Sequence, residues 1–299
     1  MVRDPLQFTA APFDGAVDPA SFFCGATQEE ALARLEWLVG QRQRCGLVVA
    51  GEGLGKSHLA AMAVRRLGGL GAEVALLSLR GLPEGEWLDM LLGRLPLDPA
   101  SRAEPIRSWL KLENRLRENT LMERPTVLVF DDLDAAPADA RDGIAWLATA
   151  SEPRFASTLV VGTCTPAGLA SVPEAIRQRA AVRIEIEPWS AADVAEYVAQ
   201  GLARVGADPE SFTPAAVATL GRFSGGAPRL ACRLAHLAAV AAAGEGLERV
   251  EAATVERAWR ELAPDCGSEY DDVAAAGSPA QETRRHPAPQ VRAVRRLWG

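Results

Sequence analysis

One short glycine-rich segment carries the clearest capacity for chemistry in this sequence. Its residues are Gly51, Glu52, Gly53, Leu54, Gly55, Lys56, Ser57 and His58. The segment lies between an apolar run, Cys45–Ala50, and a stretch of helical periodicity that extends to about Leu67. This context is typical of a Walker A loop, in which backbone amides and a helix N-terminus surround phosphate groups. Lys56 is then expected to reach the β- and γ-phosphate oxygens and Ser57 to hold Mg²⁺, which makes ATP with Mg²⁺ the predicted ligand.

The spacing of this loop and the rarity of its lysine bear on the same prediction. A Walker A loop usually has about four residues between its first glycine and the Gly-Lys pair. Here three residues separate Gly51 from Gly55 and four separate Ala50 from it, so either alanine takes the first position or the loop is one residue short. Of the 32 basic residues, Lys56 and Lys111 alone are lysines. The guanidinium of arginine is wide and planar, so it cannot replace a compact ammonium beside phosphate. A lysine at this position therefore favours phosphate binding.

A pair of acidic residues follows another apolar run. Thr126–Phe130 is predicted to be a buried strand, and Asp131 and Asp132 come directly after it. This is the Walker B arrangement, in which the first carboxylate orders the Mg²⁺ shell and the second activates the attacking water. Hydrolysing proteins with this motif normally carry glutamate at the second position, so Asp132 predicts slow turnover. Asp134 is the nearest alternative base should Asp132 not serve.

Strands and helices alternate through the first part of the chain. Further apolar strand candidates are Val74–Leu79, Thr158–Gly162 and Val182–Ile186, and helical stretches lie near 84–95, 104–120 and 137–150. This alternation predicts an α/β fold, a three-layer core with a parallel sheet. At the start of the core, Thr27 and Glu30 predict a capping box that opens a helix extending to about Arg44.

The pattern changes after Pro188. Four helices are predicted, beginning near Ser190, Thr213, Ala227 and Glu251, and no strand is expected among them. The predicted organisation is an N-terminal arm at 1–26, a nucleotide-binding domain at 27–187, a small all-helical lid domain at 188–263 and a tail at 264–299. The tail has few core-forming residues and is expected to be disordered, although its end, with Leu297 and Trp298, could dock on a partner.

Composition argues against several classes of protein. The net charge of −7 gives no overall attraction to nucleic acid. Five scattered cysteines form no CxxC pair and predict reduced thiols rather than a disulfide framework or a zinc site. The longest apolar stretch, 230–244, is interrupted by Arg233 and His236, which predicts a buried helix rather than a membrane span. The first residues lack the apolar run of a signal peptide, and we expect a cytoplasmic protein.

Three further polar residues stand in the order expected of an AAA+ ATPase. Thr163 follows the strand 158–162, where a polar sensor would contact the γ-phosphate or the attacking water. Arg179 is placed like an arginine finger offered to a neighbouring subunit, and Arg229, after Gly-Gly-Ala-Pro, is placed like a second sensor. Each also has an ordinary interpretation, as a turn residue at a strand end or as an exposed arginine.

The segments that carry a family likeness are spread over residues 6 to 263. They are Pro12-Phe13, Asp18-Pro19, Phe22-Phe23, Glu30–Leu35, the glycine-rich loop, Gln178-Arg179, Glu187-Pro188, Tyr197 and Ser224–Arg229. In order and spacing they resemble the ExeA-like AAA+ ATPases, the general secretion pathway protein A group. The resemblance implies an AAA+ core with a helical lid, ATP bound between them, and a homo-oligomer in which an arginine crosses the subunit boundary. The sequence departs from the group at Gln28, where histidine is frequent, and the membrane span and peptidoglycan-binding region of that group are not found in it.

Three functions remain open at this point. The first is an ATP-driven oligomeric switch that acts on an unidentified protein partner, such as a secretion or envelope assembly. The second is a nucleotide-binding scaffold with little hydrolysis, which Asp132 suggests. The third is a DNA-associated ATPase similar to the transposition target-selection proteins. The last predicted helix gives this third function little support, because Glu251, Glu256 and Glu261 offset Arg257 and Arg260.

Overall fold

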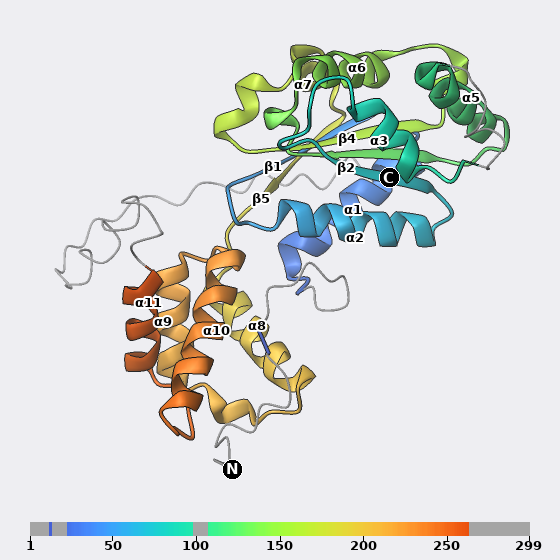
Figure 1. Ribbon diagram of the computed structural model, residues 1–299. Coiled ribbons are helices and arrows are strands. Elements are labelled where there is room, and N and C mark those ends of the chain that lie inside the picture. Colours follow the sequence, from blue (N-terminus) through green and yellow to red (C-terminus); the bar gives the residue numbers. More distant parts are fainter. Residues whose placement is uncertain (1–11, 14–22, 98–106, 263–299) are drawn as a thin grey trace, which may run out of the picture. The chain divides into compact units, whose positions relative to one another are not determined.

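The computed structural model describes residues 12–13, 23–97 and 107–262, and a parallel β-sheet of five strands organises this part of the chain (Figure 1). The strands are β1 (Cys45–Ala50), β2 (Glu73–Ser78), β3 (Thr126–Asp131), β4 (Thr158–Cys164) and β5 (Val182–Ile186). Their order in the sheet is β2-β3-β4-β1-β5, and every pairing is parallel. The carboxyl ends of all the strands therefore lie at one edge of the sheet.

Helices cover both faces of the sheet (Figure 1). One face carries α1 (Ala26–Gly40) and α2 (Lys56–Gly69), and the other carries α3 (Trp87–Arg94), α5 (Ser108–Leu121), α6 (Ala138–Thr149) and α7 (Glu174–Arg179). Strands β1, β3 and β4 are buried at every residue, as expected for strands covered on both faces. The predicted α/β fold with a parallel sheet and a three-layer core is confirmed.

Four α-helices follow the last strand in the part of the chain described up to Leu262, as the sequence predicts. They are α8 (Ala191–Arg204), α9 (Pro214–Ser224), α10 (Pro228–Gly244) and α11 (Ala252–Leu262). A capping box between Ser190 and Asp193 starts α8, and the Thr213 side chain caps α9. The chain up to Leu262 forms one compact unit, and its division into two domains at 187–188 stays a prediction. Within the described residues, no helix is long and apolar enough to cross a membrane.

The start of α1 differs from the prediction. Its N-cap is Gly25, and the backbone N–H of Glu29 donates to the Gly25 carbonyl at 3.0 Å, so Thr27 lies inside the first turn. No side chain caps this helix, which ends at Gly40 rather than near Arg44, and the predicted capping box is wrong. Most of the predicted N-terminal arm, and the tail at 264–299 with Leu297 and Trp298, lie outside the described residues.

Candidate functional site

The glycine-rich loop joins the carboxyl end of β1 to the start of α2, and two of its glycines make this turn possible. Gly53 and Gly55 have φ angles of 72° and 90°, a left-handed conformation that other residues rarely adopt. Gly55 is also the N-cap of α2, so the free amides of the first helical turn open onto the loop. The positive end of the helix dipole therefore lies where a phosphate chain is expected.

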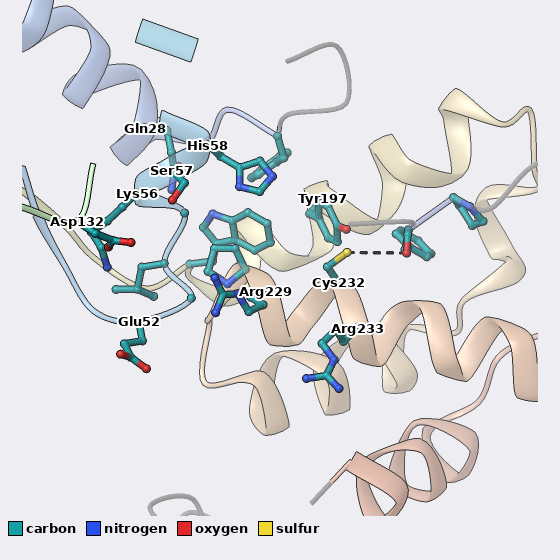
Figure 2. Close-up of a pocket in the computed structure, with 18 of the residues that line it drawn as sticks. Gln28, Glu52, Lys56, Ser57, His58, Asp132, Tyr197, Arg229, Cys232 and Arg233 are labelled. Carbon is teal, nitrogen blue, oxygen red and sulfur yellow. Dashed lines mark hydrogen bonds between the residues drawn. The ribbon is translucent and has the colours of Figure 1, made fainter. Parts of the chain in front are cut away.

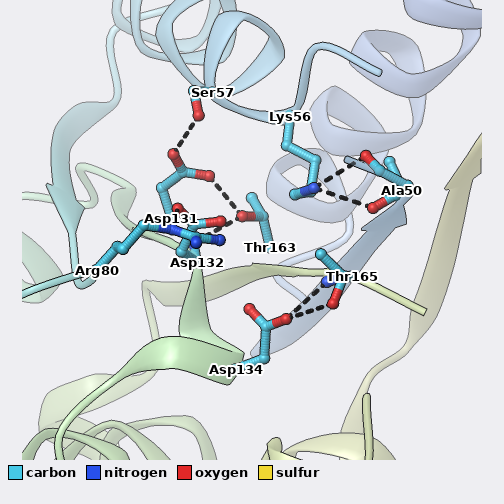
Figure 3. Close-up of polar contacts among 10 residues, drawn as sticks. Ala50, Lys56, Ser57, Arg80, Asp131, Asp132, Asp134, Thr163 and Thr165 are labelled. Atoms are coloured by element: carbon cyan, nitrogen blue, oxygen red, sulfur yellow. Dashed lines mark hydrogen bonds and ion pairs between the residues drawn. The ribbon is translucent and has the colours of Figure 1, made fainter. Parts of the chain in front are cut away.

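Lys56 is the first residue of α2 and is buried, with 8% of its surface exposed. Its Nζ donates to the carbonyl oxygens of Ala50 at 3.0 Å and Gly51 at 3.1 Å (Figure 3). An ammonium has three donors, so these two contacts anchor it at the base of the loop and leave one donor for a phosphate oxygen. Because a buried charge needs a compensating partner, this position fits an anionic ligand.

A chain of hydrogen bonds links α2, β3 and β4 beneath the loop (Figure 3). Ser57 Oγ donates to Asp131 Oδ2 at 2.6 Å, and Thr163 Oγ1 donates to Asp131 Oδ1 at 2.5 Å. The two strands are adjacent in the sheet, which brings the last residue of β3 beside the penultimate residue of β4. The structure thus brings together the two predicted Mg²⁺ ligands, Ser57 and Asp131, and the predicted sensor, Thr163.

Asp132 stands next to this chain in a left-handed conformation, with φ of 55°. Its backbone N–H donates to Thr163 Oγ1 at 3.0 Å, and its carboxylate accepts a hydrogen bond from Arg80 Nε at 2.9 Å. This hydrogen bond raises the pKa of Arg80, because the carboxylate stabilises the guanidinium cation. Sequence reasoning missed Arg80, which lies just beyond β2. The strand order that places β2 beside β3, and so Arg80 beside Asp132, belongs to the whole sheet and not to the local sequence.

A cavity of about 670 Å³ extends from the loop to helices α8 and α10 (Figure 2), a size typical of small-molecule sites. Nine of the predicted site residues line it: Glu52, Gly53, Leu54, Gly55, Lys56, Ser57, His58, Asp132 and Arg229. Arg229 is the second residue of α10, and its backbone N–H donates to the Gly53 carbonyl at 3.2 Å. This bond fixes the start of α10 against the loop, so the predicted second sensor and the phosphate-binding residues share one cavity.

Aromatic side chains line another part of the cavity. Phe23, Trp189 and Tyr197 form a cluster in which the ring centroids lie 5.1, 5.9 and 4.9 Å apart. Two buried atoms of cavity residues have no hydrogen-bond partner among the described residues: Gln28 Oε1, an acceptor, and Trp189 Nε1, a donor. Unpaired buried polar atoms are costly.

Arg179 lies away from this cavity. It is the last residue of α7 and is exposed, and its Nη1 donates to the Thr149 carbonyl at 3.4 Å. It lines a separate hollow of about 440 Å³ with residues that precede β1 and β4, such as Arg44 and Ala156. The amino ends of the strands form the edge of the sheet opposite the loop. The structure therefore does not bring Arg179 together with Lys56 of the same chain.

Comparison with solved structures finds the same fold in other proteins. Cdc6p from Pyrobaculum aerophilum has a TM-score of 0.64 and 15% identity, with 83% of this chain and 71% of that chain covered. The RuvB Holliday junction branch migration motor of Thermotoga maritima has a TM-score of 0.55 and 16% identity, with coverage of 80% and 70%. The ORC1 protein of Aeropyrum pernix, solved in complex with DNA, has a TM-score of 0.60 and 17% identity, with coverage of 82% and 68%.

At these identities the likeness concerns the fold alone, and it agrees with the predicted α/β core with a parallel sheet and helices. Membership of the AAA+ ATPases stays a prediction. No protein-family model and no curated protein sequence matches the chain. The finer resemblance to the ExeA-like group stays a prediction, as do the roles of the individual site residues.

Proposed function

We propose that this chain binds ATP with Mg²⁺ and hydrolyses it slowly. The observation that carries the proposal is the hydrogen-bond chain from Ser57 through Asp131 to Thr163, directly beneath the glycine-rich loop. A hydroxyl and a carboxylate are oxygen ligands of the kind that Mg²⁺ prefers, and the bound ion would offset charge on the phosphate oxygens. Lys56 supports the β- and γ-phosphates, and Thr163 orients the attacking water.

The second part of the proposal is that nucleotide binding acts as a switch. The cavity has walls from the loop, from the residues just before α1 and from the lid helices α8 and α10. A ligand that contacts Lys56, Phe23 and Arg229 together would favour one arrangement of these elements over others. Ligands shift conformational equilibria by such differential contacts, so ATP and its hydrolysis products would stabilise different states.

The third part concerns assembly. We propose a homo-oligomer in which Arg179 of one copy completes the nucleotide site of the next, because Arg179 is exposed at the edge opposite its own loop. An arginine supplied in this way stabilises the charge of the transition state. The partner on which the switch acts is an unidentified protein, which the ExeA-like resemblance suggests is a secretion or envelope assembly. A DNA-associated role is the alternative, since one structural neighbour was solved with DNA.

One observation favours a scaffold with little hydrolysis as a second candidate function. The Asp132 carboxylate, the predicted base, is paired with the Arg80 guanidinium at 2.9 Å. The hydrogen bond from Arg80 Nε occupies Oδ2 of this carboxylate, so that oxygen is not free to take a proton from the attacking water while the pair is formed. If this pair persists with nucleotide bound, the protein binds ATP and turns it over very slowly.

Equilibrium binding of a fluorescent ATP analogue, with and without Mg²⁺, tests the proposal. Asp131→Asn should weaken binding in the presence of Mg²⁺ by roughly tenfold or more, because a hydrogen bond to a charged group contributes about 1.5–3 kcal/mol. The same variant should change little when EDTA is present. Asp142→Asn, an exposed substitution on α6, is the control and should leave both affinities unchanged. Equal affinity in Asp131→Asn and the parent protein would contradict the assignment of the metal site.

A further inference from the structure

A second side-chain link joins the segments that follow β3 and β4 (Figure 3). Asp134, in the 3-10 turn η1 (Leu133–Ala135), accepts two hydrogen bonds at Oδ2. Thr165 Oγ1 donates one of them at 2.6 Å, and the Thr165 backbone N–H donates the other at 3.0 Å. Thr165 Oγ1 in turn accepts a hydrogen bond from the Gly168 backbone N–H at 2.9 Å. None of these groups belongs to the predicted phosphate or Mg²⁺ contacts.

The packing around Asp134 leaves its carboxylate little freedom. A Cβ at Gly168 would lie 1.9 Å from Asp134 Oδ2, so this close approach requires glycine. The other carboxylate oxygen, Oδ1, is covered from solvent and has no partner among the described residues. Asp134 does not line the nucleotide cavity. To reach a water there it would have to break both bonds to Thr165, which makes it a poor candidate for the alternative base.

The link lies where the backbone ladder between β3 and β4 has ended. The last paired residues of the two strands are Phe130 and Gly162. Beyond them, side chains connect the two segments: Thr163 to Asp131 and Asp132, and Thr165 to Asp134. On their other sides both strand ends are still paired in the sheet, Thr163 with Val48 of β1 and Asp131 with Ser78 of β2. Between β3 and β4 themselves, the spacing at the Thr163 hydroxyl depends on these side-chain bonds.

We propose that Asp134 is a positioning residue that holds the Thr163 hydroxyl in place during ATP hydrolysis. This inference rests on the proposed function. The hydrogen bond between Thr163 and Asp131 joins two groups that ligands would also use. The nucleotide would compete for the Thr163 hydroxyl, the predicted sensor, and the metal would compete for the Asp131 carboxylate, which is predicted to order the Mg²⁺ shell. Neither nucleotide nor metal competes for the bonds between Asp134 and Thr165. These bonds therefore hold the segment after β4 against the segment after β3, at a position two residues beyond Thr163.

The test compares the rate and the affinity of variants that weaken this link. Asp134→Asn should lower kcat for ATP hydrolysis by roughly tenfold to a hundredfold, because a misplacement of about 1 Å costs up to about a hundredfold in rate. The Kd for MgATP should stay unchanged, since Asp134 touches neither phosphate nor metal. Thr165→Val removes one of the two bonds and should lower kcat less. The double variant should lose no more than Asp134→Asn alone, as expected for residues of one link.

Asp139→Asn is the matched control. The Asp139 carboxylate on α6 also accepts a backbone bond, from Gly85 at 2.9 Å, and its Oδ1 is likewise covered without a partner among the described residues. This variant should lower the melting temperature about as much as Asp134→Asn and leave kcat unchanged. If Asp134→Asn does not fold, the kcat and the melting temperature of Thr165→Val are compared with those of Asp139→Asn instead.

Three results would overturn the inference. They are an unchanged kcat in both Asp134→Asn and Thr165→Val, an equal loss of kcat in Asp139→Asn, and a loss of MgATP affinity that accounts for the whole effect. Failure of the proposed function is seen separately, because the parent protein would then neither bind nor hydrolyse ATP.

Discussion

At the scale of single residues, Asp132 combines an unusual backbone conformation with the predicted role of base. Its φ of 55° and ψ of 49° are left-handed, and aspartate is among the few residues that tolerate this, because its short polar side chain can bond locally. Glutamate has no such local compensation. The sequence identified the carboxylate after the strand, but nothing in its local pattern revealed the conformation. The turn from β3 into η1 therefore gives a physical reason for aspartate where glutamate is usual.

We expect Asp132→Glu to raise kcat several-fold and to leave ATP affinity unchanged. The aspartate carboxylate falls short of a glutamate carboxylate by about one C–C bond, roughly 1.5 Å, and about 1 Å of misplacement can cost a hundredfold in rate. The same change should lower the free energy of unfolding by about 1 kcal/mol, because glutamate enters a left-handed turn.

Phosphate release at saturating ATP and thermal denaturation measure the two effects. Asp132→Asn, which tolerates the left-handed turn, is the control and should abolish turnover. Faster phosphate release together with a loss of about 1 kcal/mol in the free energy of unfolding supports the account. A lower rate in Asp132→Glu together with an unchanged rate in Asp132→Asn would show that Asp132 is not the base.

At the scale of elements, the positions of the strands in the sequence were predictable, and their order in the sheet was not. Apolar runs identified β1, β3 and β4, because these strands are covered on both faces and carry little else. Strands β2 and β5 were also predicted, although they are only partly buried and alternate between the core and the surface. The order β2-β3-β4-β1-β5 is not written in any local pattern. Arg80 and Thr165 were missed for this reason, since each matters through its contact with the segment that follows β3.

The glycine-rich loop gives a prediction at this scale. Gly55→Ala should lower the free energy of unfolding by about 1–3 kcal/mol, because alanine must adopt a φ of 90° at the N-cap of α2. It should also abolish nucleotide binding, since the amides of the loop move. Chemical denaturation and ATP titration measure these two effects.

Gly68→Ala is the matched control in the same helix, where a Cβ meets open space. This variant should be more stable by about 0.4–1 kcal/mol and should bind ATP normally. A Gly55→Ala protein that is as stable as the parent would contradict the described loop conformation.

At the scale of the whole molecule, the site depends on contacts that no local pattern contains. The aromatic part of the cavity joins Phe23 to Trp189, whose ring centroids lie 5.1 Å apart although the residues are far apart in sequence. Gln28 is a departure from a family pattern in the sequence. The structure shows that this residue lines the cavity and that its covered Oε1 has no hydrogen-bond partner among the described residues. Arg179 was predicted to act on a neighbouring subunit, and its exposed position on the opposite edge agrees with that hypothesis without testing it.

A mixing experiment tests the proposed assembly. Arg179→Ala should keep ATP affinity and slow hydrolysis by about 10³-fold or more, the effect expected of a true arginine finger. Lys56→Ala should lack both binding and hydrolysis. Mixed oligomers should regain part of the activity, because one copy supplies the nucleotide site and the other supplies the arginine. With assembly confirmed by light scattering, no recovery in the mixture would mean that Arg179 is a surface residue.

The central claim, that the glycine-rich loop binds MgATP through Lys56, is tested most directly by ligand-induced thermal stabilisation. At a ligand concentration a hundredfold above Kd, the parent protein should gain about 2.7 kcal/mol of stability. Lys56→Ala should lose this gain, because it removes the buried ammonium that we propose contacts the phosphates. Lys111→Ala, which removes the second of the two lysines in the sequence, should keep it. An equal shift of the melting temperature by MgATP in the parent, Lys56→Ala and Lys111→Ala proteins would contradict the claim.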